Sequence, residues 1–442
     1  MDLAEGKSRA MSVRRVAAWL VRLELPILLL VYADFVVTDR APLAAFGVIG
    51  LIWLARVWTT GKLTGTPFDL PILILLAWLP ISAAVSNYPA LTMPKIYGVL
   101  LSVAFFYAVV NQITTRRDLA WAAWWLVLTC IAISIAGLVG TDWAQNKIIS
   151  MTFIYDRLPH VIQGIPRSIA GGFARNGVGG TLTLIVPMLA TLAVPKSKVK
   201  SQKSKESGLF TVHRPLSTTL LWLALILSLV TLALTQSRGA ILGTLVGLLA
   251  LAIWRERRFA WLIPAGAAVL LIVLAIGQGS VVAEFLLRMD AANGTLASRL
   301  EVWTRGVMMV QDFPFTGIGL GTYNNVAHTL YPFFIAAPDE VVAHAHNDLL
   351  EVAVDVGIPG LIAYVALLTG FVICAVRAYR AVDDAGARAL IAGLGFGMLA
   401  HQTFGLTDAF ILGTKPGVLM WVYFALAAVS FARREEWREA DG

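Results

Sequence analysis

Long apolar runs follow one another along almost the whole chain, and they leave few choices of fold. A helix needs roughly 17–25 apolar residues to cross the hydrocarbon core of a bilayer. Helices are favoured there because their backbone groups are satisfied without water. The candidate membrane spans are residues 17–38, 42–57, 69–86, 97–113, 119–139, 176–195, 216–235, 239–254, 259–278, 358–376, 389–406 and 416–432. The sequence therefore predicts an all-α, polytopic transmembrane bundle of about 12 spans.

Composition supports a membrane protein and argues against a nucleic-acid partner. Of the 442 residues, 58% are hydrophobic and 14% are charged, whereas soluble domains carry about 25% charged residues. The formal net charge is +8. The basic excess lies in short loops between apolar runs, where Lys and Arg report topology and contact with anionic lipids. Membrane lipids are the partners that this pattern predicts.

The distribution of basic residues predicts an orientation. If the N-terminus is cytoplasmic and each run crosses once, most of the 35 Lys and Arg fall on the inside, as the positive-inside rule expects. Both termini are then cytoplasmic, and residues 1–442 form a single integral membrane domain. Two long loops, 140–175 and 279–357, face the periplasm. Loops of this length usually carry function.

The second long loop contains an amphipathic segment. Apolar residues recur at helical spacing over 297–312, and they include Trp303, with Arg299 and Arg305 interleaved. This predicts a helix on the membrane or on the bundle. The following stretch, from Pro314 to Gly321, is rich in turn-forming glycine. A plain surface lid is the alternative interpretation of this region.

A histidine segment near the end of the same loop is the strongest candidate for catalysis. It contains His344 and His346, followed by Asn347, Glu351 and Asp355 on one helical stripe. A neutral His346 at a helix N-terminus could take a proton from a hydroxyl. His344 remains the alternative base, and a loop histidine bonded to backbone is the alternative role. His-x-His is a weak zinc hint without a third ligand at the expected spacing, so we expect neither metal nor other cofactor.

Several arginines occur on the predicted outer face, against the usual charge trend. Arg167 and Arg175 precede one span, and Arg238 lies in a very short connection between two spans. A guanidinium group matches phosphate oxygens bidentately. Each arginine alone could simply reach the lipid headgroups. Their gathering on one face predicts an anionic lipid-phosphate substrate.

Four segments resemble motifs of the O-antigen ligase/polymerase family. They are Arg167 to Asn176, Gln236 to Ala240, Ser298 to Gly321, and His346 to Gly360. Asp355 departs from the family, in which Glu is common at this place, and the charge is kept.

This resemblance implies a helical fold of the lipid-sugar glycosyltransferase (GT-C-like) type in the bacterial inner membrane. It implies metal-independent transfer of a glycan from undecaprenyl diphosphate to a sugar hydroxyl of lipid A–core at the periplasmic face. It further implies His346 as general base and Arg167, Arg175, Arg238 and Arg299 as diphosphate ligands.

Three alternatives stay open. An O-antigen polymerase or a protein O-glycosyltransferase of the same superfamily would use similar chemistry on another acceptor. A transporter would instead place converging polar groups near the midplane of the membrane. The sequence does not name the glycan, the acceptor hydroxyl or the oligomeric state.

Overall fold

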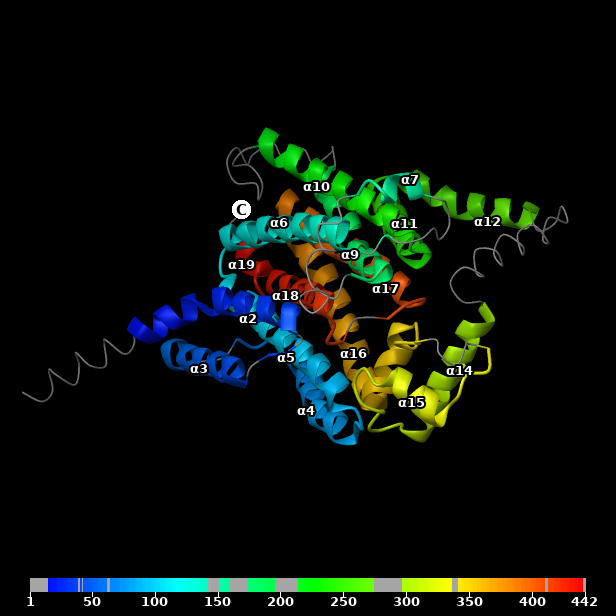
Figure 1. Ribbon diagram of the computed structural model, residues 1–442. Coiled ribbons are helices and arrows are strands. Elements are labelled where there is room, and N and C mark those ends of the chain that lie inside the picture. Colours follow the sequence, from blue (N-terminus) through cyan, green and yellow to red (C-terminus); the bar gives the residue numbers. More distant parts are fainter. Residues whose placement is uncertain are drawn as a thin grey trace, which may run out of the picture.

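The computed structural model describes residues 15–38, 40–41, 43–61, 64–141, 143, 151–158, 173–194, 214–273, 296–335, 341–409 and 412–439. Within these ranges the regular structure is helical and contains no strand. The one β-type contact there is an isolated bridge between Thr141 and Phe173. Figure 1 shows the helices gathered around α9, α17 and α18, with α14 and α15 beside one end of α16.

The helices coincide with the apolar segments of the sequence. In chain order they are α2 (Glu24–Thr38), α3 (Leu43–Thr60), α4 (Asp69–Val85), α5 (Pro89–Gln112), α6 (Arg116–Gly140), α7 (Thr152–Tyr155), α9 (Arg175–Ala193), α10 (Arg214–Thr235), α11 (Arg238–Arg255), η2 (Arg257–Trp261), α12 (Leu262–Val273), α14 (Leu296–Asp312), α15 (Tyr323–Leu330), α16 (Asp348–Ala381), α17 (Ala385–Gly405), η4 (Lys415–Gly417), α18 (Val418–Ala432) and α19 (Arg434–Glu439). Each predicted span overlaps one of them.

Among the described residues, seven helices are long and apolar enough to cross a membrane. The number is up to eight if the helix Arg15–Arg22 and the helix after it, bent by 46°, form one broken span. The chain is thus a polytopic helical membrane protein, and the count of about 12 crossings stays a prediction. Helices α3 and α4 are apolar but shorter than the others.

Helix α9 is the centre of the bundle. Its residues from Val178 to Ala193 are all buried, and α10, α11 and α17 pack around it. Close approach depends on glycine: a Cβ added to Gly393 of α17 would lie 3.2 Å from the Met188 backbone. Nearer the candidate site, a Cβ added to Gly243 of α11 would collide with Ala400 O of α17, so these two helices also approach closely toward the end of the bundle at which the site lies.

Helix α16 is kinked at Gly357, which adopts φ 72° and ψ −178°. Positive φ is accessible to glycine at little cost, and Pro359 lacks the N–H that an unbroken helix requires. The turn after α14 satisfies the freed backbone groups. Ile358 N donates to Pro314 O at 2.7 Å, and Ile318 N donates to Val354 O at 2.9 Å. The kink therefore locks the glycine-rich turn against α16.

In its described residues, the loop predicted over 279–357 contains α14, α15 and the first turns of α16. The expected amphipathic helix is present as α14 and packs on α16, so it lies on the bundle. Gly306 of α14 faces Leu350 of α16, since an added Cβ would lie 2.9 Å from Leu350 Cδ2. Helix α15 was not expected from the sequence. Its first residue, Tyr323, is fully buried and donates its hydroxyl to Val302 O at 2.6 Å.

Candidate active site

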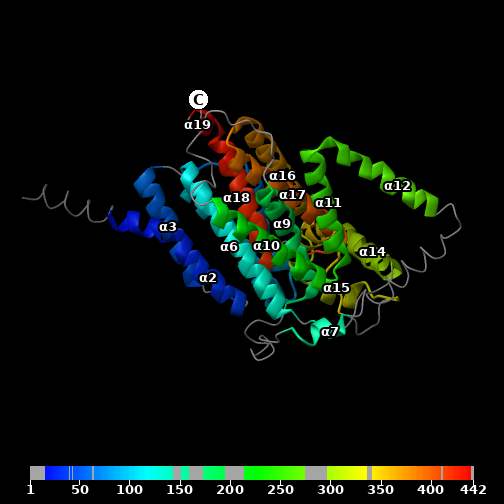
Figure 2. The same ribbon diagram turned by 90° about the horizontal axis from the view of Figure 1, so that it is seen from above.

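A polar cavity of about 460 Å³ lies where the N-terminal turns of α9 and α16 meet the connection between α17 and α18. Its charged and imidazole side chains are Lys95, His344, His346, Asp348, Glu351, Asp355 and Asp408. Figure 2 shows α7 and α15 at the end of the bundle opposite α19. Polar groups thus gather at one end of the helices.

Local contacts fix the histidine segment that leads into α16. Asn347 is the N-cap of the helix, and its side-chain oxygen accepts the Leu350 N–H at 3.0 Å, as is usual at a helix start. Glu351 Oε2 accepts the Ala345 N–H at 2.6 Å, which ties the histidine loop back to the helix. The expected helix start near His346 is confirmed, because α16 begins two residues later.

Left-handed backbone conformations mark the two turns beside the cavity. Among the described residues, Gln236 (φ 48°) and His346 (φ 50°) are the non-glycine residues with positive φ. Such conformations cost free energy and persist where surrounding contacts impose them. Gln236 is held by its side-chain amide, which donates to the Tyr155 hydroxyl at 2.6 Å. The strained backbone therefore orients His346 on one turn and Arg238 on the other.

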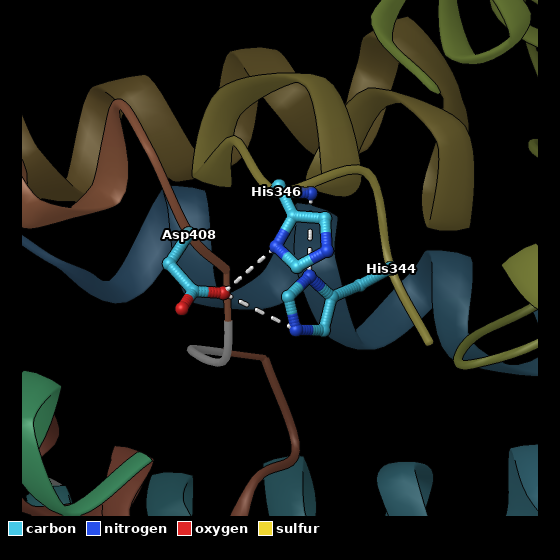
Figure 3. A group of neighbouring side chains, drawn as sticks. All are labelled: His344, His346 and Asp408. Atoms are coloured by element: carbon cyan, nitrogen blue, oxygen red, sulfur yellow. Dashed lines mark hydrogen bonds and ion pairs between the residues drawn. The ribbon is translucent and has the colours of Figure 1, made fainter. Parts of the chain in front are cut away.

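His344, His346 and Asp408 form the base side of the cavity. His344 Nε2 and His346 Nδ1 each lie 3.3 Å from Asp408 Oδ1, and Figure 3 shows both rings turned toward this carboxylate. His344 Nδ1 also accepts the His346 backbone N–H at 3.2 Å. Both nitrogens of His344 are thus engaged.

These partners define the tautomers of the two rings. His344 accepts at Nδ1, so the proton of its neutral ring is on Nε2, which lies 3.3 Å from Asp408 Oδ1. The contact of His346 Nδ1 with Asp408 places the proton of that ring on Nδ1. His346 Nε2 then carries an unprotonated lone pair. Of the two histidines, His346 is the one that can act as a base.

Burial and charge each favour one protonation state of His344 and of Asp408 near neutral pH. Burial lowers the pKa of His344 to about 4, although the nearby Asp408 carboxylate acts in the opposite direction. For Asp408, burial alone would raise the pKa, but the hydrogen bond with His346 and the charges of both rings hold it below its usual value. The carboxylate is therefore ionised, and the His344 ring is neutral.

The first turns of α9 and α11, with Arg175 and Arg238, form what we call the cation side. Ala174, Asn176 and Gly177 line the cavity. Glycine allows α9 and the α10–α11 turn to touch, because a Cβ added to Gly179 would lie 3.0 Å from Ser237 Cβ. Arg175 and Arg238 are half-buried. Helix N-termini carry partial positive charge and attract anions.

The cation side and the base side meet through the α17–α18 connection. A Cβ added to Gly239 would collide with Thr407 Oγ1, and Thr407 precedes Asp408. The start of α11 therefore touches Thr407, the chain neighbour of Asp408, whose carboxylate contacts His346. Asn347 joins the same connection, since its side-chain nitrogen donates to Leu406 O at 3.3 Å.

Other predicted site residues lie away from the cavity lining. Arg299, Trp303 and Arg305 belong to α14 and do not line the cavity. Arg305 instead forms an ion pair with Glu301 at 3.5 Å, and its guanidinium lies 5.3 Å from the Phe334 ring. Arg167 lies outside the described residues. The structure thus brings His344, His346, Glu351 and Asp355 together around the cavity. Arg175 and Arg238 do not line it, although the neighbours of Arg175 do.

Sequence reasoning missed Lys95, Asp348 and Asp408. Asp408 lies between two apolar runs on the predicted outer face, and Lys95 lies just before the run at 97–113. A charged residue at the outer end of a predicted span was the signal that could have identified both positions. Their partners, however, come from distant parts of the chain. The stem of Lys95 packs on Gly321, where an added Cβ would lie 3.1 Å from Lys95 Cγ.

Asp355 acts through backbone contacts and its position in the cavity. Its Oδ1 accepts the Gly321 N–H at 2.9 Å, so it holds the glycine-rich turn against α16. Ser82 of α4 reinforces this turn by accepting the Leu320 N–H at 2.9 Å.

Within the described residues, the three ligand atoms of His344, His346 and Asp408 also lie within 4.8 Å of one another, close enough to hold a metal ion. Asp408 is the third ligand that the sequence did not reveal.

The fold and the cavity together define a class: a polytopic helical membrane protein with a histidine–carboxylate cluster at one end of its bundle. Residues 223–365 match a family model described as O-antigen ligase. The resemblance to an O-antigen ligase-type family is thereby confirmed for this segment. It includes the Ser237–Arg238 turn, α14, α15 and the histidine segment. No curated protein gives a significant match to the chain.

The match indicates the O-antigen ligase/polymerase superfamily, whose members are glycosyltransferase-like enzymes of O-antigen assembly. Arg175, Lys95 and Asp408 lie outside the matched segment. Their relation to the histidines comes from the three-dimensional structure alone.

Proposed function

We propose that this protein transfers an O-antigen glycan from undecaprenyl diphosphate to a sugar hydroxyl of lipid A–core. The reaction takes place on the periplasmic face of the bacterial inner membrane, with both termini in the cytoplasm. His346 is the general base, and no metal ion takes part. Arg175 and Arg238 hold the diphosphate; Arg167 and Arg299 remain predicted contributors to this role.

The observation that carries the proposal is the contact between His346 Nδ1 and the Asp408 carboxylate. Asp408 Oδ1 accepts from Nδ1 at 3.3 Å, which leaves the Nε2 lone pair for a substrate proton. The ring lines the cavity, so a hydroxyl inside can reach it. A carboxylate in this position also stabilises the imidazolium that forms when the base accepts a proton, as in other Asp–His pairs.

The chemical step is a single displacement. The acceptor O–H gives its proton to His346 Nε2, and its oxygen forms a bond to the anomeric carbon. The bond from that carbon to the diphosphate oxygen breaks, and undecaprenyl diphosphate leaves with the electron pair. Attack from the face opposite the leaving group inverts the anomeric configuration.

The cation side favours departure of the diphosphate. Negative charge grows on the leaving oxygen as the glycosidic bond breaks, so fixed cations stabilise the transition state more than the bound substrate. Arg175 and Arg238 stand at the start of α9 and α11, where the helix ends add partial positive charge. Arg175 itself does not line the cavity, but Ala174 and Asn176 on either side of it do, which supports a cation close to the bound diphosphate.

The orientation follows from charge and from the length of α16. Its part after the kink, residues 358–381, is about 36 Å long at about 1.5 Å per residue, which by itself spans a hydrocarbon core of about 30 Å. Its first turns, before the kink, can therefore stand above the membrane core together with the cavity. Helix α19, which begins with the basic residue Arg434, lies at the opposite end of the bundle (Figure 2), which supports cytoplasmic termini.

The test is reconstitution of the purified full-length chain with a lipid-diphosphate glycan and lipid A–core. Transfer is expected with the wild type, to be lost with His346→Ala, and to be unchanged by a chelator. His328→Ala is the matched control, since His328 belongs to α15 and does not line the cavity.

Other acceptors decide between related enzymes. Extension of a second lipid-linked glycan in place of lipid A–core would identify a polymerase, and transfer to protein hydroxyls would identify a protein O-glycosyltransferase. Retained transfer by a folded His346→Ala variant would remove the base assignment. Chelator-sensitive transfer would remove the metal-free mechanism.

A further inference from the structure

The His344–His346–Asp408 cluster has a geometry beyond that of a hydrogen-bonded base. His344 Nε2 and His346 Nδ1 each lie 3.3 Å from Asp408 Oδ1. The candidate ligand atoms of these three residues lie within 4.8 Å of one another. A tetrahedral Zn²⁺ with bonds of about 2.0–2.1 Å separates its ligand atoms by about 3.3–3.5 Å. Both nitrogen–oxygen separations already have this length.

The donor set and its surroundings suit a divalent transition metal. Two imidazole nitrogens and one carboxylate oxygen are common Zn²⁺ ligands, and a fourth position would open into the cavity. Asp348, Glu351, Asp355 and Lys95 line the same cavity, so polar groups surround the open position. The ligand geometry carries the site.

We propose that this cluster reversibly binds Zn²⁺ or a similar divalent transition metal, and that the bound metal switches off the base. The metal takes His346 at Nδ1, the atom that otherwise donates to Asp408. A neutral imidazole carries one ring proton, so metal at Nδ1 leaves that proton on Nε2. The lone pair that would accept the substrate proton is then gone. The metal is an inhibitor in this scheme and takes no part in the transfer reaction.

Metal binding has a structural cost that keeps it reversible. With metal on His344 Nε2, the proton of that ring moves to Nδ1. The His346 backbone N–H, which donates to this Nδ1 at 3.2 Å, then loses its acceptor. No proton is released overall, because each ring only changes its tautomer. The inhibitory effect rests on the proposed function, whereas metal binding does not.

Binding can be measured without any transfer assay. The purified full-length chain, free of any histidine tag, is titrated with Co²⁺ while the visible absorption of a tetrahedral site is followed, and Zn²⁺ is used in competition. One ion per chain is expected. His344→Ala, His346→Ala and Asp408→Asn should each weaken binding by at least about tenfold.

His328→Ala is the matched control, because it removes a histidine from α15 and leaves the cluster intact. Its Co²⁺ affinity should equal that of the wild type. Size-exclusion profiles and thermal melting of each variant establish that it is folded. Absence of Co²⁺ and Zn²⁺ binding to the wild type, or binding that survives all three cluster substitutions, would overturn the site.

Inhibition is measured separately in the reconstituted transfer reaction. Zn²⁺ should abolish transfer at the concentration that fills the site, and a chelator should restore it. Full activity with the site occupied would overturn the inhibitory role. If the wild type transfers no glycan at all, the proposed function fails while the binding titration still decides the metal site.

Discussion

The two sides of the cavity are built by different means. On the base side, side chains hold one another: His344 and His346 both contact Asp408 Oδ1 at 3.3 Å. On the cation side, the backbone provides the arrangement, since glycine contacts bring the starts of α9 and α11 together. In the proposed mechanism one group takes the proton, whereas several donors share the stabilisation of an anion. Substitution of a base-side residue should therefore lower the transfer rate more than substitution of one arginine.

The largest effect is expected for His346→Ala. General base catalysis contributes about 10²- to 10⁴-fold, so kcat/KM for glycan transfer should fall by about this factor. The rate of transfer in proteoliposomes measures it. His328→Ala should stay near the wild-type rate. Equal transfer rates for His346→Ala and the wild type would contradict the assignment of His346 as the general base.

Asp408→Asn should come next, with a decrease of about 10²- to 10³-fold in kcat. The amide no longer fixes the Nδ1–H tautomer of His346 or stabilises the imidazolium. The rate of transfer in proteoliposomes measures this loss. A wild-type rate for Asp408→Asn would contradict the positioning role of Asp408.

Arg238→Ala and Arg175→Ala should each lower kcat/KM by about 10- to 100-fold, less than a lost base because other donors remain. Arg→Lys at the same positions should recover part of the loss, since the charge stays while the bidentate geometry goes. Steady-state rates at varied donor concentration measure both. A greater loss for Arg299→Ala than for either residue would shift the diphosphate site toward α14.

The smallest effect concerns stability. Because burial lowers the pKa of His344 to about 4, the folded state disfavours the proton that the unfolded chain accepts near pH 6.5. The stabilising contribution is present above pH 6.5 and is lost as the pH falls toward 4. It amounts to about 2 kcal/mol after allowance for solvent. Asp408, His346 and Lys95 are the charged or titratable groups that influence it.

Thermal melting in detergent between pH 4 and 7 measures this dependence. The His344→Gln variant carries no titrating group at this position and should show a flatter curve over the same range. If the two curves keep the same slope, acid sensitivity arises elsewhere, and the neutral state of His344 has no part in it.

Much of the fold could be predicted because its signals are local. Apolar runs of spanning length require helices in lipid, and the periodicity of 297–312 requires one amphipathic face. The stripe of Asn347, Glu351 and Asp355 at helical spacing similarly indicated a helix in this segment. The kink at Gly357 was less accessible, since the partners of its free backbone groups, Pro314 and Ile318, come from a separate turn.

The sequence by itself determined the helical membrane class, the family resemblance and the histidine segment, because these depend on hydropathy and on residues close together in the chain. Tertiary structure decided which charges meet. Asp408 reaches His346 from 62 residues away, and Lys95 enters the same cavity from α5. Tertiary structure also keeps Arg305, which pairs with Glu301, out of the cavity lining. Packing of helix ends fixes such neighbours, and no spacing along the chain records which ends will touch.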